Sequence, residues 1–288
     1  MEYQCGLVLQ GGGTRSAFTA GVLDVLMENK IGFPYVIGTS AGALSALNFL
    51  SGDEGRTKKI EIALMRDSKF VSLSNLLFKG SIFDFDYLFF TVPETIIPFN
   101  KKAYMDNPTH FVVATTDLET GKARYFVKGE CQDMWSAIAA SSSLPLLTRK
   151  PIFVDGHPCL DGGPTANLPF RKALEDGCFK IVVVATRARG FRKDEPKRTH
   201  IREAEILYKK YPAFVEAFAN QHFSYNRSAE ELDLLESNGQ AFVIRPDHPV
   251  TIGRTERKKE KLNALYKEGQ EVAKRLLPSL RLFLSSVK

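Results

Sequence analysis

Residues 33–42 read Phe33-Pro34-Tyr35-Val36-Ile37-Gly38-Thr39-Ser40-Ala41-Gly42, a short apolar run that ends in a serine with glycine two positions to either side. This pattern is typical of a nucleophile elbow, a sharp turn from a strand into a helix. Such a turn strains the serine backbone, and glycine at 38 and 42 removes side chains that would collide there. The pattern therefore predicts that Ser40 projects its hydroxyl at a helix N-terminus, where the helix dipole favours developing negative charge.

A second glycine-rich motif follows an apolar run at residues 4–9. It reads Gln10-Gly11-Gly12-Gly13-Thr14-Arg15-Ser16 and precedes a segment with apolar residues at helical spacing. Backbone N–H groups in such a loop are unobstructed and bind anions. A dinucleotide site would require glycine at position 16 and an acidic residue after the second strand. Since that strand ends in the Ser40 turn instead, an oxyanion hole for Ser40 fits better.

A third motif is Asp161-Gly162-Gly163. An aspartate before two glycines lies in a tight turn with little side-chain cover, so its carboxylate can approach another group closely. An ordinary Asp-Gly turn accounts for the same residues, because aspartate and glycine are common in turns. Taken alone, this motif favours the ordinary turn.

Together, the motifs resemble those of the patatin-like phospholipase family. Residues 11–16 are similar to its oxyanion loop, residues 38–42 to its nucleophile motif and residues 161–163 to its aspartate motif. Two lesser blocks, residues 116–121 and 139–145, are also similar. The resemblance extends over about residues 5–190, with Ser16 in place of the glycine that usually closes the first motif.

The resemblance implies a two-residue catalytic site without histidine. Ser40 would attack an ester carbonyl, and Asp161 would take its proton as general base. Partial burial beside an apolar pocket would raise the pKa of Asp161 toward the operating pH. The family needs no metal or cofactor. The implied oxyanion hole comprises Gly11, Gly12, Gly13 and Ala41, and the supporting motif residues are Arg15, Gly38, Gly42, Gly162 and Gly163.

Two other functions stay open at this stage. A Ser-Asp-His triad would need His200, His222 or His248, the histidines that follow Asp161. None of them has the surroundings of a catalytic loop, and an α/β-hydrolase has several strands before its nucleophile. The other alternative is a lipid-binding protein without turnover, which would need neither Ser40 nor Asp161.

Alternation of strand and helix patterns predicts an α/β fold with a mostly parallel central sheet and helices on both faces, and the resemblance implies a patatin-like three-layer sandwich. We expect a hydrolase core at residues 1–190 and a C-terminal helical extension with one strand, packed on the core, at 191–288. The expected strands lie near 4–9, 33–38, 110–116, 122–127, 151–155, 180–185 and 240–245. The expected helices lie near 15–29, 41–51, 55–66, 132–141, 168–176, 201–218, 227–238 and 257–285.

Composition agrees with a single enzyme that has a sizeable core. The chain has 288 residues, 44% hydrophobic content and a formal net charge of +6. No run of 18 or more apolar residues predicts a membrane span, and the first residues lack the basic region of a signal peptide. The four cysteines lack metal-site spacing. We therefore expect a cytoplasmic protein that acts on a lipid ester or phospholipid, with transient contact to anionic membranes as an option and no nucleic-acid partner.

Three further segments bear on substrate choice. The aromatic-rich stretch 70–99 suits either a cap over an acyl-chain pocket or the core. The basic stretch 187–202 suits either anionic head groups or a solvated loop. An apolar stripe along residues 262–283 predicts an amphipathic helix that packs on the body of the protein, with a kink or break at Pro278.

Overall fold

The computed structural model describes residues 2–286, apart from the side chain of Glu61. Its strands are β1 (Tyr3–Leu9), β2 (Tyr35–Thr39), β3 (His110–Asp117), β4 (Ala123–Val127), β5 (Ile152–Val154), β6 (His157–Asp161), β7 (Cys178–Val184) and β8 (Ala241–Ile244). Within the described residues they form one eight-stranded sheet in the order β5-β6-β3-β2-β1-β7-β8, with β4 paired to β3. The pairs among β3, β2, β1, β7 and β8 are parallel, and those that involve β4, β5 and β6 are antiparallel. The predicted α/β class with a mostly parallel sheet is therefore confirmed.

Helices of very different length connect these strands. The described helices are α1 (Ser16–Glu28), α2 (Ala41–Leu50), α3 (Arg56–Leu64), α4 (Leu73–Phe78), α5 (Val92–Thr95), α6 (Lys101–Asp106), α7 (Met134–Ser141), α8 (Gly163–Ala166), α9 (Phe170–Glu175), α10 (Arg198–Leu207), α11 (Pro212–Ala219), α12 (Gln221–Ser237) and α13 (Lys259–Ser285), with a 3-10 turn η1 (Gly13–Arg15) and a π-type turn η2 (Tyr87–Thr91). None of them is long and apolar enough to cross a membrane within the described residues.

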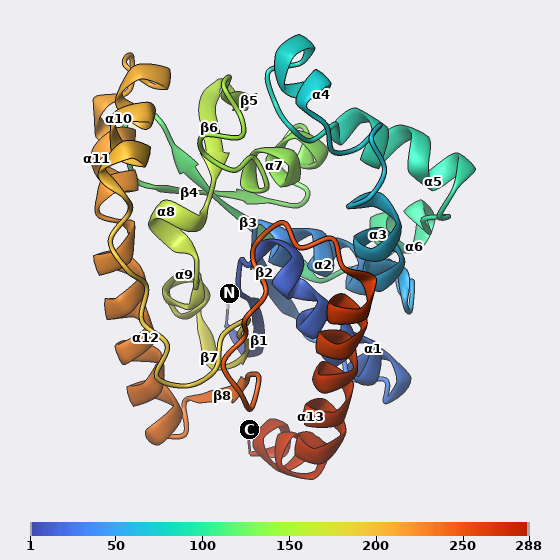
Figure 1. Ribbon diagram of the computed structural model, residues 1–288. Coiled ribbons are helices and arrows are strands. Elements are labelled where there is room, and N and C mark those ends of the chain that lie inside the picture. The colour runs from blue at the N-terminus through green and yellow to red at the C-terminus, as the bar shows by residue number, and fades with distance from the viewer. Residues whose placement is uncertain (1, 287–288) are drawn as a thin grey trace.

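Helices cover both faces of the sheet (Figure 1). Successive side chains of a strand point to opposite faces. Leu7 and Leu9 of β1 accordingly join a core with α1, α2 and α13, whereas Val8 joins a core with α9 and α12. The buried parallel strands therefore have apolar residues on both faces, which is why they read as continuous apolar runs in the sequence.

The C-terminal helix α13 packs on α1, as its apolar stripe predicted. A Cβ atom on Gly21 of α1 would lie 2.1 Å from the carbonyl oxygen of Tyr266, so glycine allows the two helices to approach closely. The Tyr266 hydroxyl donates a 2.7 Å hydrogen bond to Asp24 of α1. Pro278 lies inside α13, and the helix continues past it without a break.

The seven predicted strands are all present, and β6 is an additional one. Pro158 lies in β6, and proline is unusual inside a sheet, so the pattern there did not indicate a strand. The single helix predicted over 201–218 is wrong: α10 ends at Leu207 and α11 begins at Pro212. Proline lacks an N–H group and restricts the residue before it, so it starts a new helix. Strand β8 pairs with β7, and the division at residue 190 stays a prediction.

Candidate active site

Ser40 lies at the turn between β2 and α2, as the glycine spacing predicted. Its φ of 57° and ψ of −128° are strained for a residue with a side chain. A Cβ atom on Gly38 would lie 2.7 Å from the amide nitrogen of Ala43, and one on Gly42 would lie 2.4 Å from the carbonyl oxygen of Leu9. Glycine at both positions is therefore what allows the turn to close.

Asp161 lies at the end of β6, and its carboxylate faces Ser40. The Ser40 hydroxyl donates a 2.6 Å hydrogen bond to Asp161 Oδ2, and the Gly163 amide donates a 2.7 Å bond to Oδ1. Both Ser40 and Asp161 are buried. Burial raises the pKa of Asp161, although the hydrogen bonds from Ser40 and Gly163 oppose this shift. The structure thus places a serine hydroxyl in direct contact with a carboxylate that burial makes more basic.

The strained turn has a second support in Ser141, the last residue of α7. The Ser40 amide donates a 2.7 Å hydrogen bond to Ser141 Oγ, which in turn donates a 2.6 Å bond to the carbonyl oxygen of Ala114 in β3. Ser141 is fully buried. The sequence motif at 139–145 contains this serine but did not indicate its role. The available signal was a serine at the end of a mostly apolar helix.

The glycine-rich loop lies beside Ser40. The Gly11 amide donates to the carbonyl oxygen of Asn167 at 3.2 Å, so it is already occupied. Among the described residues, the amides of Gly12, Gly13 and Ala41 have no hydrogen-bond acceptor. These three remain available to a ligand.

Residues at both ends hold the loop in place. The Thr14 amide donates to the carbonyl oxygen of Arg254 at 2.9 Å, a contact with a distant residue that the sequence did not indicate. Ser16 is buried, and its hydroxyl donates to the carbonyl oxygen of Gly13 at 2.8 Å. Serine therefore fits at the position where the family motif usually has glycine.

The histidines do not complete a triad. Within residues 2–286, no histidine hydrogen-bonds to Ser40 or Asp161: His200 is exposed at the rim of a neighbouring pocket, and His222 Nδ1 is buried without a partner. In the same part of the chain, no three His, Cys, Asp or Glu side chains are grouped as metal ligands. The arrangement of the described residues is that of a serine–aspartate pair.

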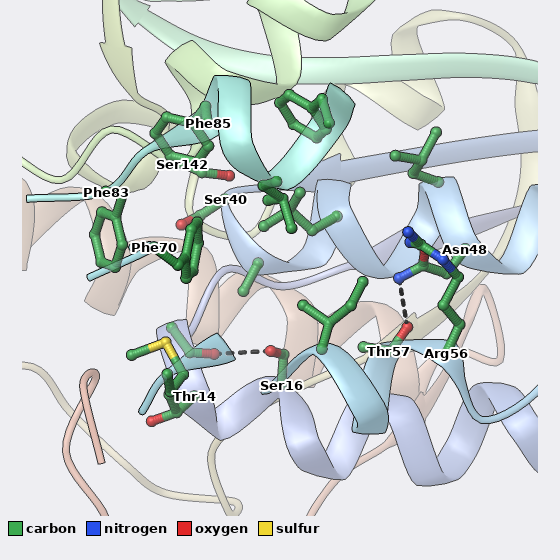
Figure 2. Close-up of a pocket in the computed structure, with 18 of the residues that line it drawn as sticks. Thr14, Ser16, Ser40, Asn48, Arg56, Thr57, Phe70, Phe83, Phe85 and Ser142 are labelled. Carbon is green, nitrogen blue, oxygen red and sulfur yellow. Dashed lines mark hydrogen bonds between the residues drawn. The ribbon is translucent and has the colours of Figure 1, made fainter. Parts of the chain in front are cut away.

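Ser40 lines two pockets. The first, the apolar pocket, has a volume of about 100 Å³ and is lined mostly by aliphatic and aromatic side chains from α2, α3 and the segment 65–99. Figure 2 shows Phe70, Phe83 and Phe85 gathered near Ser40, with Arg56 away from it. Arg56 is buried and donates to the carbonyl oxygens of Pro98 and Ile97, which closes this end of the pocket.

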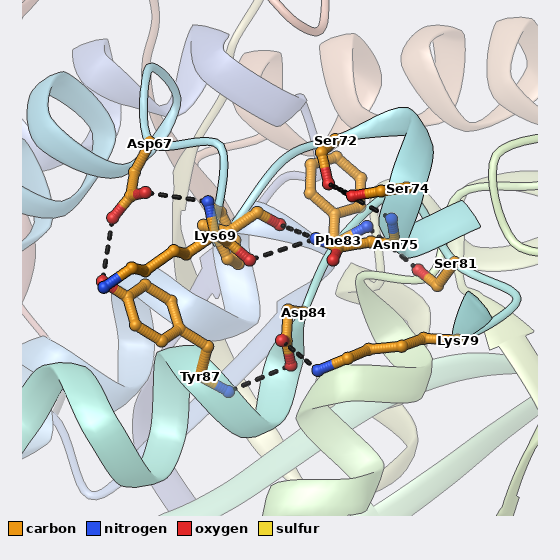
Figure 3. A network of polar contacts seen from close by, with 11 residues as sticks. Asp67, Lys69, Ser72, Ser74, Asn75, Lys79, Ser81, Phe83, Asp84 and Tyr87 are labelled. Atoms are coloured by element: carbon orange, nitrogen blue, oxygen red, sulfur yellow. Dashed lines mark hydrogen bonds and ion pairs between the residues drawn. The ribbon is translucent and has the colours of Figure 1, made fainter. Parts of the chain in front are cut away.

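The aromatic stretch 70–99 lines the apolar pocket and also forms a buried cluster of its own, whereas its role as a cap over an acyl chain stays a prediction. Several of its rings line the apolar pocket, whereas Phe78 and Phe90 are 88% and 58% exposed. A polar network within residues 67–87 holds the first part of the stretch together (Figure 3). The Tyr87 hydroxyl donates to Asp67 at 2.8 Å, and Lys79 forms an ion pair with Asp84. The stretch is therefore a wall of the pocket with its own fixed contacts.

The second pocket, the polar pocket, has a volume of about 680 Å³ and is also lined by Ser40. The glycine-rich loop, Asp161 and part of the basic stretch 187–202 line it. Two other cations of that stretch point elsewhere: Arg189 and Arg192 form ion pairs with carboxylates of α12. The basic stretch is thus divided between the pocket and the surface of α12.

The fold and the Ser40–Asp161 pair place the chain in the class of α/β proteins with a serine at a strained strand-to-helix turn. The family model of the patatin-like phospholipases matches residues 7–174, more than half of the chain, and includes both residues. The chain therefore belongs to the patatin-like phospholipase family. A second model, described as a domain of unknown function (DUF6363), matches residues 211–285.

Known proteins similar to this chain share only part of their length with it. The chain is 29% identical over 183 residues to the uncharacterized protein YjjU of Escherichia coli (strain K12), a match that covers 62% of this chain and 51% of that protein. It is 31% identical over 188 residues to neuropathy target esterase sws of Drosophila melanogaster, covering 62% of this chain and 12% of that protein. The crystal structure of VipD from Legionella pneumophila has a TM-score of 0.53 at 14% identity, covering 97% of this chain and 67% of that one. This last likeness concerns the fold alone.

Proposed function

We propose that the protein is a serine acyl hydrolase of lipid esters, of the phospholipase A, lysophospholipase or esterase type, and that Ser40 and Asp161 form its catalytic dyad. The observation that carries the proposal is the 2.6 Å hydrogen bond between the Ser40 hydroxyl and Asp161 in a buried site. Membership of the patatin-like phospholipase family supports lipid esters as the substrate class. The adjoining apolar pocket is suited to an acyl chain.

In the first half of the reaction, Asp161 accepts the hydroxyl proton while Ser40 Oγ attacks the ester carbonyl. The negative charge that develops on the carbonyl oxygen is held by the amides of Gly12, Gly13 and Ala41. Cleavage of the ester bond then releases the alcohol, which takes the proton from Asp161. The acyl group stays on Ser40 as an ester.

In the second half, Asp161 accepts a proton from water, and the resulting hydroxide attacks the acyl-serine. The fatty acid leaves, and the proton on Asp161 returns to Ser40 Oγ. A carboxylate at its ordinary pKa is a weak base for either step, because its pKa lies far below the operating pH. Burial raises the pKa of Asp161 and so makes its carboxylate a better match for the task.

The test is hydrolysis of p-nitrophenyl esters by the wild type, Ser40→Ala, Asp161→Asn and a combined alanine variant of His200, His222 and His248. The dyad predicts that the first two variants are inactive and that the histidine variant is active. A folded but inactive histidine variant would support a triad instead. Absence of both ester turnover and fluorophosphonate labelling in the wild type would support a lipid-binding protein without turnover.

A further inference from the structure

Besides the exposed Lys197, four cationic side chains line the polar pocket that contains the dyad. Arg15 comes from η1, Arg187 and Lys193 from the segment after β7, and Arg254 from the segment before α13. Three stretches that are distant in the sequence thus contribute positive charge to one cavity. Arg15 is only 7% exposed, and its Nε atom has no hydrogen-bond partner.

These four cations lack ion-pair partners. In the described part of the chain, none of them forms a salt bridge with a carboxylate. Lys193 donates to the neutral side chain of Gln221, and Arg187 donates to the backbone of Val250. By contrast, Arg189 and Arg192 of the same basic stretch are paired with acidic residues of α12. Of the four, Arg15 is buried, Arg187 and Lys193 are half-buried, and Arg254 is exposed. A charge that loses water without gaining a partner is costly, so the unpaired Arg15, Arg187 and Lys193 favour a bound anion here.

The cations also destabilise one another. Burial lowers the pKa of Lys193 to about 7, and the positive charges of Arg254 and Arg15 contribute to this shift. Burial, with the charges of Arg187 and Arg254, lowers the pKa of Arg15 to about 9. A bound anion would relieve this repulsion. Besides Asp161, the carboxylates that line the pocket are exposed and belong to Asp194, Glu195 and Glu203.

We propose that Arg15, Arg187, Lys193 and Arg254 form a subsite for a phosphate group on the alcohol part of the substrate, and that the preferred lipid ester carries a phosphate monoester there. The inference rests on the proposed hydrolase function. Ser40 lines both pockets, so an ester that it attacks with the acyl chain in the apolar pocket can extend its alcohol part into the polar pocket. A phosphate monoester has about −1.5 to −2 charges at neutral pH, whereas a choline head group would bring a further cation among four.

The first experiment measures binding without turnover. Thermal unfolding of the full chain is followed with sn-glycerol 3-phosphate, inorganic phosphate or glycerol for the wild type, Lys193→Gln and Arg192→Gln. Both variants remove a basic side chain from adjacent positions, but only Lys193 lines the polar pocket. We expect glycerol 3-phosphate to raise the Tm of the wild type and of Arg192→Gln, and to raise the Tm of Lys193→Gln by a smaller amount. Glycerol should change none of the three Tm values.

The second experiment measures selectivity with three palmitoyl esters in identical mixed micelles: lysophosphatidic acid, lysophosphatidylcholine and monoacylglycerol. We expect kcat/KM of the wild type and of Arg192→Gln to favour lysophosphatidic acid by about tenfold or more, as a charge-assisted contact allows, and Lys193→Gln to lose most of this preference. Equal rates on the three esters would overturn the proposal while leaving the hydrolase intact. If inorganic phosphate stabilises the protein but the three rates are equal, the site is one for free phosphate and the head-group assignment is wrong. Stabilisation by glycerol 3-phosphate without turnover of any ester would instead support the subsite and refute the hydrolase.

Discussion

Replacing Ser141 with alanine removes the hydroxyl that connects the Ser40 amide to strand β3. In the wild type this hydroxyl accepts from the Ser40 amide at 2.7 Å and donates to the carbonyl oxygen of Ala114 at 2.6 Å. The side chain is fully buried, so water does not easily replace it. The variant leaves one buried donor and one buried acceptor without partners, and the donor belongs to the most strained residue of the site.

The size of the effect follows from these two groups. An unsatisfied buried polar group costs about 1–3 kcal/mol, so the free energy of unfolding should fall by about 3 kcal/mol for the pair. For a chain of this size, each kcal/mol lowers Tm by about 2–4 °C, which predicts a drop of about 6–12 °C. Typical stabilities of about 5–15 kcal/mol leave the variant folded. Displacement of the Ser40 hydroxyl should lower kcat by up to about 100-fold with little change in KM.

Ser143→Ala is the matched control. Ser143 is equally buried, and its hydroxyl donates to the carbonyl oxygen of Ala139 without contacting Ser40. That carbonyl also accepts from the Ser142 amide, so it keeps a partner in the variant. Thermal unfolding and p-nitrophenyl butyrate kinetics of the two variants show whether the effect is specific to Ser141. Equal Tm and equal kcat for both would refute the idea that Ser141 positions the nucleophile.

Three other changes test separate parts of the site. Asp161→Asn should lower hydrolysis by about 10²–10⁴-fold yet raise Tm at neutral pH. Burial raises the pKa of Asp161, so the contribution of Asp161 to stability is present at low pH and is lost as pH rises through that pKa. The difference in Tm between Asp161→Asn and the wild type should therefore shrink toward acid pH. Wild-type kcat/KM should fall as pH drops through a pKa above that of an ordinary aspartate. Leu44 lies one turn into α2, in the wall of the apolar pocket. Leu44→Phe should lower the rate of p-nitrophenyl palmitate hydrolysis relative to that of p-nitrophenyl butyrate about tenfold. An unchanged ratio would contradict an acyl chain in that pocket. Gly13→Ala would place a Cβ atom 2.2 Å from the carbonyl oxygen of Arg254, at a residue with a φ of +59°, and should abolish hydrolysis. Its control is Gly52→Ala, where φ is +71° but the Cβ atom would lie in open space. This control should lower the free energy of unfolding by about 1–2 kcal/mol, measured with denaturant, and leave hydrolysis unchanged.

The sequence predicted those features that depend on neighbouring residues. The glycine spacing around Ser40 reflects collisions within the turn itself and with the adjacent first strand, and it therefore indicated the turn correctly. Continuous apolar runs indicated the buried parallel strands for the same local reason. The apolar stripe of α13 likewise indicated a packed helix, although not its partner α1.

The sequence patterns did not predict features that depend on contacts between residues far apart in the chain. The carbonyl oxygen of Arg254 positions the glycine-rich loop from 240 residues away (254 − 14). The basic stretch looked uniform in the sequence, yet Lys193 lines the polar pocket and Arg192 pairs with Glu230. Such differences depend on which element packs nearby, and a single sequence does not contain that information.

The spacing between Ser40 and Asp161 is set by strand β3, which explains how two distant residues meet without a histidine between them. Thr39, the residue before Ser40, pairs with Ala114, and Asp161 pairs with Thr115, the next residue of β3. The Ala114 carbonyl also receives the Ser141 hydroxyl that supports the Ser40 amide. Since a slip of one residue in a strand turns every side chain to the other face, the two registers on β3 have to agree for the carboxylate to reach the hydroxyl. The geometry of the dyad therefore depends on sheet pairing as much as on the two motifs, and substitutions in β3 that loosen either register should lower hydrolysis although they touch neither catalytic side chain.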